Sequence, residues 1–318
     1  MTQLSAADSA TRDSPAYVDT SPTSIVLDTD IGTDVDDILA LAVILGSPEL
    51  SLSGVTTVYG DVELRARMVA RAIRSAGASL PPIVPGRSQT RSGRPVWWPG
   101  HEGRLMHGLE DEAIDSGDAV AVLAASETVV GIGPLTDLAA LAELPGRRTS
   151  HAYLMGGDFG APSRVEHNIR CDVAAADVVF RSSLQLTVVG LDQTERVRID
   201  ARMLDRIADA GEFGAMLAAE VQQFWRFAEQ DYNVPHDAIA VLSVIRPDLF
   251  TFSSGVIEVD TSGESAELEG MTRFTSAEGG RHRIVTDLDT AAVSDEIVRR
   301  ILRSTRHSST PLNEENHR

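Results

Sequence analysis

The chain contains, near its start, the sequence Asp28-Thr29-Asp30-Ile31-Gly32-Thr33-Asp34-Val35-Asp36-Asp37. An apolar run at 24–27, typical of a buried strand, precedes it, and residues 36–45 follow with helical spacing and an acidic start. Five carboxylates within ten residues repel one another, and a hard divalent cation with oxygen ligands, Ca²⁺ or Mg²⁺, would relieve the repulsion. The alternative is a solvated loop whose acids only cap the helix. The stretch therefore predicts a strand–turn–helix unit and a candidate metal site.

Two other acidic motifs fit this stretch poorly. An EF-hand loop needs a glycine after its third aspartate and a glutamate six residues later, whereas Gly32 comes one position early and Ile38 stands six beyond it. A phosphatase of the haloacid dehalogenase type would use Asp28 or Asp30 as nucleophile, but it needs Thr or Val where Gly32 stands and a lysine later in the chain. All 28 cationic residues are arginine, so this chemistry and every other lysine-dependent mechanism are excluded.

Outward from this unit, apolar runs alternate with helical patterns. Strands are predicted at 52–58, 128–132, 152–155 and 186–189, and helices at 62–75, 135–144 and 173–182. The later chain is predicted to be helical over 200–246, to form hairpins over 250–286 and to end in a helix over 290–302. This order predicts one α/β domain over 24–305, with a mostly parallel central sheet flanked by helices and ligands at the carboxyl ends of its strands.

Composition narrows the functional classes. The polar segments 1–23 and 306–318 are predicted to be disordered tails, and the first lacks the features of a signal peptide. No apolar run of about 18 residues is present, so we expect no membrane association. A net charge of −19 argues against a nucleic-acid partner. The single cysteine, Cys171, fits a reducing compartment, and we expect a cytoplasmic protein.

Several blocks resemble, in order, the motifs of the inosine-uridine-type nucleoside hydrolases. The acidic stretch with Ala40-Leu41 resembles Asp-Thr-Asp-Pro-Gly-x-Asp-Asp-x-x-Ala-Leu, with Ile31 for proline and two extra residues. This register pairs Asp36 with Asp37, and a second register uses Asp34. The remaining blocks are Val55–Asp61, Ile132–Ala139, Leu154–Gly157, Glu166–Asn168 with Asp172, and Pro235–Ala238. The resemblance spans about residues 24–302.

The resemblance implies a Ca²⁺-dependent enzyme that hydrolyses the N-glycosidic bond of ribonucleosides to ribose and free base. It implies that Asp30 is the general base on a metal-bound water and that His236, titrating near 6.5, protonates the leaving base. The implied Ca²⁺ ligands are Asp30, Asp37, Asp237 and the backbone carbonyl of Ile132. The implied ribose contacts are Asp36, Asp61, Met155, Glu166 and Asn168. The implied assembly is a homodimer or homotetramer.

Other contacts stay open at this point. His167, His101 and His107 are candidates to contact the base, as are Trp225, Phe227 and Tyr232, although aromatic residues on an amphipathic helix more often belong to the core. Asp158 or Gly160 stands where an asparagine would contact the ribose 5′ side. Two rival functions are a metal-dependent phosphatase on the same acids and a non-catalytic nucleoside- or ribose-binding protein.

Overall fold

The computed structural model describes residues 21–262 and 268–306. In these ranges a nine-stranded sheet has the order β3-β2-β1-β4-β5-β6-β9-β7-β8. The strands from β3 to β9 in this order run parallel, and β7 is antiparallel to both β9 and β8. The bounds are β1 Thr23–Thr29, β2 Leu50–Thr57, β3 Ile83–Pro85, β4 Thr128–Gly131, β5 His151–Met155, β6 Gln185–Val189, β7 Phe250–Val259, β8 Thr272–Ser276 and β9 His282–Leu288. The predicted α/β class with a mostly parallel sheet is confirmed.

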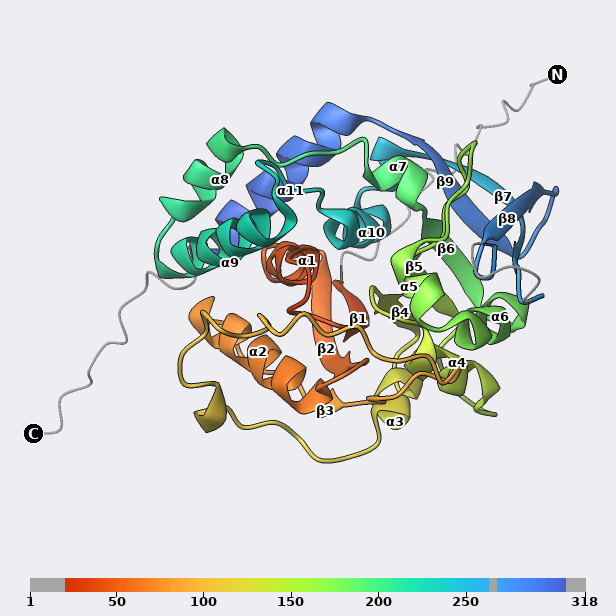
Figure 1. Cartoon of the computed structure of the whole chain (residues 1–318), viewed down its shortest axis with the longest axis horizontal. Helices are drawn as coiled ribbons and strands as arrows, with labels where there is room; N and C mark the ends of the chain where they lie inside the picture. The colour runs from red at the N-terminus through yellow and green to blue at the C-terminus, as the bar shows by residue number, and fades with distance from the viewer. Residues whose placement is uncertain (1–20, 263–267, 307–318) are drawn as a thin grey trace, which may run out of the picture.

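Helices cover both faces of the sheet (Figure 1). One hydrophobic cluster joins the sheet to α1 (Asp36–Leu45), α2 (Val62–Ser75), α10 (His236–Ile245) and α11 (Thr290–Ser304), with α8 (Ala201–Ala208) and α9 (Glu212–Ala228) packed outside them. A second cluster joins the opposite face to α3 (Ala119–Ala124), α4 (Thr136–Glu143) and α6 (Val173–Arg181). Both clusters are built from the alternating apolar side chains of the strands, which explains why the sheet must be covered twice.

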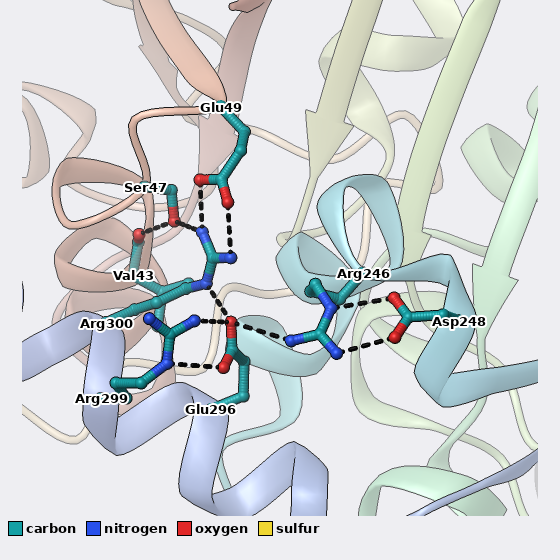
Figure 2. Close-up of polar contacts among 8 residues, drawn as sticks. All are labelled: Val43, Ser47, Glu49, Arg246, Asp248, Glu296, Arg299 and Arg300. Carbon is teal, nitrogen blue, oxygen red and sulfur yellow. Dashed lines mark hydrogen bonds and ion pairs between the residues drawn. The ribbon is translucent and has the colours of Figure 1, made fainter.

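An ion-pair network fastens α11 to α1 and α10 (Figure 2). Arg300, 1% exposed, donates to both carboxylate oxygens of Glu49 and to Glu296. Glu296 also pairs with Arg299 and Arg246. The helices approach closely here, because a Cβ at Gly46 would lie 1.9 Å from the carbonyl oxygen of Arg300. The network therefore fastens the C-terminal end of α1 to α11, whereas the acids lie in the first turn of α1, at the other end of the helix.

The sequence predicted the long elements better than the short ones. Helices 36–45 and 62–75 have the predicted bounds. The predicted helical region 200–246 divides at Gly211, with φ of 103°, and at Pro235. The short strands β4, β5 and β6 were predicted, but β3 and the short helices were not, since helical turns of three to six residues carry little periodicity. Those not yet named are α5 His167–Cys171, α7 Leu191–Thr194, and the 3₁₀ helices η1 Leu109–Asp111 and η2 Pro247–Leu249.

Two other expectations need adjustment. The hairpin prediction holds for β7 and β8, whereas β9 inserts between β6 and β7 and runs parallel to β6. Most of the two predicted tails, residues 1–20 and 307–318, lies outside the described residues, and β1 begins at Thr23, inside the predicted N-terminal tail. Within the described ranges no helix combines the length and the apolar character needed to cross a bilayer.

Candidate functional site

A cavity of about 270 Å³ opens at the carboxyl ends of β1, β4 and β5. β1 and β4 are neighbours in the sheet, but the strand that follows β1 in the chain, β2, lies toward one edge, and the strand that follows β4, β5, lies toward the other edge. The direction of the chain across the sheet therefore reverses between β1 and β4. Such a reversal opens a crevice between the loops that follow the two strands. Nine of the ten predicted site residues line the cavity, namely Asp30, Asp36, Asp37, Ile132, Met155, Glu166, Asn168, His236 and Asp237.

Three buried carboxylates meet at the floor of this cavity. Asp36 and Asp37 lie in the first turn of α1, and Asp237 lies in the first turn of α10. Each offers an oxygen, and these oxygens lie within 4.8 Å of one another. Asp30 lines the same cavity but does not belong to this closest group of three. Asp36, predicted to contact ribose, therefore lies directly beside the predicted metal ligands Asp37 and Asp237.

The electrostatics of the cluster favour a bound cation. Burial, followed by the charges of neighbouring aspartates, raises the pKa of Asp36, Asp37 and Asp237 well above the usual value. Burial also raises the pKa of Asp30, against the opposing effect of the Arg65 guanidinium. Such carboxylates lose protons readily only when a positive charge compensates them. A donor set made entirely of oxygen atoms fits a hard divalent ion such as Ca²⁺.

Asp34, the aspartate of the second register, also reaches the cavity wall. Its carboxylate accepts a hydrogen bond from the backbone N–H of Val35 at 2.5 Å, and it is more exposed than Asp36. Burial raises the pKa of Asp34 to about 7. The two extra residues of the loop thus place a further carboxylate at the rim, while Asp36 stays with Asp37 and Asp237.

Further residues of the cavity follow β4 and β5. The Nδ2 of Asn168 donates to the carbonyl oxygen of Ile132 at 3.0 Å. Glu166 caps α5, because its carboxylate accepts hydrogen bonds from the backbone N–H groups of Gly157, Asn168 and Ile169. These bonds hold Glu166 and Asn168 at the cavity with their orientations set by the backbone. Polar groups and Met155 thus line the same cavity as the acid cluster.

His236 differs from the expectation for its charge. Its Nδ1 forms a 2.7 Å hydrogen bond with the hydroxyl of Thr194. Burial lowers the pKa of His236 to about 4, so the ring is neutral at pH 7. The expectation of a histidine that titrates near 6.5 and carries a proton at neutral pH is therefore wrong, because the desolvation of the half-buried ring at the cavity wall disfavours its charged form.

Asp61 is the one predicted site residue that the structure places outside the cavity. It is exposed and forms the N-cap of α2, where its carboxylate accepts a hydrogen bond from the N–H of Leu64 at 3.0 Å. The capping bond turns the side chain toward its own helix. The expectation that Asp61 contacts ribose is corrected accordingly.

The aromatic lining differs from the expected set. Trp97 and Phe224 line the cavity together with His167, whereas Trp225, Phe227 and Tyr232 do not. Phe227 instead contacts Trp97, His101 and Phe224 at the rim, with ring centroids 4.5–6.5 Å apart. His107 is exposed. Residue 97 lies in a long connection without helical or strand periodicity, and thus the sequence offered no signal for it beyond the pair Trp97-Trp98.

The expected contact on the ribose 5′ side is also absent from the cavity lining. Asp158 is buried, and its carboxylate accepts hydrogen bonds from the backbone N–H of Gly160 and from Arg164. Leu191 lines the cavity instead. The cavity is therefore lined by the apolar side chain of Leu191, and by neither Asp158 nor Gly160.

Sequence comparisons identify similar proteins over most of the chain. The family model described as inosine-uridine preferring nucleoside hydrolase matches residues 25–295. Probable uridine nucleosidase 2 of Arabidopsis thaliana is 27% identical over 88% of this chain and 98% of its own length. The non-specific ribonucleoside hydrolase RihC of Escherichia coli (strain SMS-3-5 / SECEC) is 31% identical over 76% of this chain and 84% of its own length.

Solved structures show the same fold. The purine-preferring ribonucleoside hydrolase from Gardnerella vaginalis matches with a TM-score of 0.77 over 89% of this chain and 99% of its own, at 23% identity. The plant nucleoside hydrolase PpNRh1 matches with a TM-score of 0.75 over 88% of this chain and 99% of its own, at 23% identity. At these identities the likeness supports the architecture alone.

Proposed function

Because the chain belongs to the inosine-uridine preferring nucleoside hydrolase family, we propose that its cavity hydrolyses the N-glycosidic bond of ribonucleosides with the help of Ca²⁺. One observation carries this proposal. Asp36, Asp37 and Asp237 form a buried all-oxygen cluster, and it lines one cavity together with Asp30, Glu166 and Asn168. A sugar with several hydroxyl groups fits a cavity that combines metal-binding and hydrogen-bonding groups.

We assign the cation to a set of oxygen atoms from four residues. Asp37 and Asp237 would hold it, with Asp30 and the carbonyl oxygen of Ile132 completing the protein ligands. When bound, Ca²⁺ would lower the pKa of the attacking water and fix the two neighbouring hydroxyl groups of ribose. Selection of ribose over deoxyribose follows, because a deoxyribose lacks one of these hydroxyls.

The residues around the sugar then have distinct tasks. Asp30 accepts a proton from the attacking water, whose oxygen forms the new bond to C1′. Asp36, Glu166 and Asn168 hydrogen-bond the ribose hydroxyls and orient the ring. The bond from C1′ to the base nitrogen breaks through an oxocarbenium-like transition state, and its electron pair leaves with the base.

The leaving base needs a hydrogen-bond donor. The single hydroxyl proton of Thr194 has two acceptors in reach, Nδ1 of His236 at 2.7 Å and the carbonyl oxygen of Leu191 at 3.3 Å. We propose that it goes to the nearer one, Nδ1, which places the proton of the neutral His236 ring on Nε2. We propose that this N–H donates to the departing base. Trp97 and Phe224, from distant segments, provide apolar surface on which the base stacks.

A nucleoside panel tests the function. Purified protein is incubated with inosine, uridine and cytidine, with Ca²⁺ or with a chelator, and free ribose and base are measured by chromatography. We expect ribose from at least one nucleoside and its loss on chelation. Nucleoside binding without ribose release would favour the binding-protein hypothesis, and phosphate release from a generic ester would favour the phosphatase. Light scattering of the same sample tests the predicted homodimer or homotetramer.

A further inference from the structure

Arg65 and Arg300 are the two largest fully buried side chains, and their charges are neutralised differently. Arg300 pairs with Glu49 and Glu296 (Figure 2). Arg65 forms no ion pair with any carboxylate of the described ranges. Its donors go instead to uncharged oxygens. A buried arginine without an ion pair is costly, and its retention requires a compensating arrangement around it.

The acceptors of Arg65 lie in the segment that carries the acids. Nη1 donates to the carbonyl oxygens of Asp30 and of Ile31, the latter at 2.6 Å. Nη2 donates to the hydroxyl of Thr33 at 3.2 Å. The guanidinium therefore spans the turn that connects β1 to α1, and it holds the backbone on which the carboxylate of Asp30 stands.

Two further segments meet at the same guanidinium. Nε donates to the carbonyl oxygen of Tyr59 at 2.7 Å, and Tyr59 has a φ of 70°, which is unusual for a residue other than glycine. The ring of Trp98 lies over the guanidinium carbon at 4.9 Å. Gly60 permits this approach, because a Cβ there would lie 2.8 Å from the Trp98 ring. Trp98 adjoins Trp97, which lines the cavity.

We propose that Arg65 is a positioning residue, whose planar fork orients the Asp30 turn for cation binding and whose charge offsets the repulsion among the buried acids. This inference rests on the proposed function, because it assumes that the acids bind a cation. Arg65 touches neither substrate nor cation in this role. Its effect reaches the cavity through the backbone of residues 30–33 and through Trp98.

The exchange Arg65→Lys distinguishes the effect of the planar hydrogen-bonding fork of Arg65 from the effect of its positive charge. Lysine keeps the positive charge but presents a point donor that cannot replace the planar fork. Ca²⁺ binding is measured by calorimetry, and kcat and KM are measured with the best nucleoside of the panel. We expect Ca²⁺ affinity to fall by about tenfold or more, since residues that orient metal ligands have effects of this size. We expect kcat to fall more than KM rises.

Arg300→Lys is the matched control, because it makes the same exchange at the other fully buried arginine. It should lower the melting temperature while Ca²⁺ affinity and kcat/KM stay within about twofold of wild type, as expected for a distant site. Wild-type affinity and kcat in Arg65→Lys would overturn the inference. An equal loss of affinity in both variants would also overturn it, because that result indicates a general effect of destabilisation.

A second variant covers the case in which Arg65→Lys does not fold. Trp98→Leu removes the ring over the guanidinium and leaves the hydrogen-bonding groups of Arg65 in place. We expect Ca²⁺ affinity to fall by about threefold or more, in line with a cation–π contact to a half-buried ring, whereas the control Trp225→Leu should bind Ca²⁺ like wild type. Unchanged affinity in Trp98→Leu would overturn the inference. A wild-type protein that binds no Ca²⁺ would instead overturn the proposed function, and the inference with it.

Discussion

Asp37 and Asp237 begin two different helices, α1 and α10, and their carboxylate oxygens lie within 4.8 Å of each other. The two helices lie side by side, as Figure 1 shows. The N-terminus of a helix carries partial positive charge, so each first turn favours an aspartate. Because the N-terminal ends of α1 and α10 meet here, buried like charges lie close together. The cation proposed for this site would neutralise them.

The first prediction concerns the cation. Asp237→Asn should abolish most of the rise in melting temperature that Ca²⁺ produces in the wild-type protein. A ligand at about 100 times its Kd stabilises the folded state by about 2.7 kcal/mol, which a thermal shift resolves easily. Asp205→Asn, at an exposed position of α8, serves as the control and should keep the full shift. An undiminished shift in Asp237→Asn would remove Asp237 from the ligand set.

The second prediction concerns the general base. Asp30→Asn should lower kcat by about 10²–10⁴-fold, the usual contribution of a positioned acid or base. The fold should survive, since an uncharged amide is easier to bury than a carboxylate whose pKa burial has raised. Turnover is measured by ribose release, and folding is measured by circular dichroism and thermal melting. Near-wild-type turnover in the folded variant would show that Asp30 is not the base.

The third prediction separates the two registers of the acidic stretch. Asp36→Asn should raise KM by about tenfold or more, because a hydrogen bond from ribose to a charged acceptor is lost. Asp34→Asn makes the same exchange at the rim and should leave KM within about threefold of wild type, because a more exposed group loses less. The reverse order of the two effects would assign the ribose contact to Asp34.

The fourth prediction concerns Asp61. Its exchange for alanine should leave kcat and KM unchanged and should destabilise the protein by about 1 kcal/mol, the usual effect of losing an N-cap. Urea unfolding measures the stability, and the nucleoside assay measures the activity. A large increase in KM would return Asp61 to the substrate site and would contradict its placement as a cap.

The fifth prediction uses the pH dependence of stability. Burial alone would raise the pKa of Glu296, but hydrogen bonds and ion pairs with Arg299 and Arg300 outweigh burial and lower this pKa to about 2. A group with a lowered pKa in the folded state stabilises the protein above its unfolded pKa. This contribution is lost as the pH falls from about 4.5 toward 2.

Glu296→Gln should therefore destabilise the protein at pH 7 by about 3 kcal/mol, since a buried ion-pair partner is removed. The difference between variant and wild type should shrink as the pH falls toward 2. Urea midpoints between pH 7 and pH 2.5 measure both effects. A difference that stays constant over this range would show that Glu296 does not titrate in the way its contacts imply.

The sequence by itself determined the fold class and the principal elements. Helices 36–45 and 62–75 were predictable because local signals mark them. Both have acids in the first turn, followed by a continuous apolar run in the first helix and by a regular apolar period in the second. The ordered motifs predicted the family, which the comparisons confirm. The motifs also identified nine residues that line one cavity. This was possible because the motifs follow parallel strands, whose carboxyl ends lie at the same edge of the sheet.

Only the tertiary structure decided which of these residues act together. The charge of His236 depends on the desolvation of its ring at the cavity, and the place of Asp61 depends on a bond within its own helix. Trp97 and Phe224 meet because a loop and a helix from different parts of the chain pack at one rim. Burial, desolvation and long-range contacts are properties of the folded chain, and no local pattern of residues contains them.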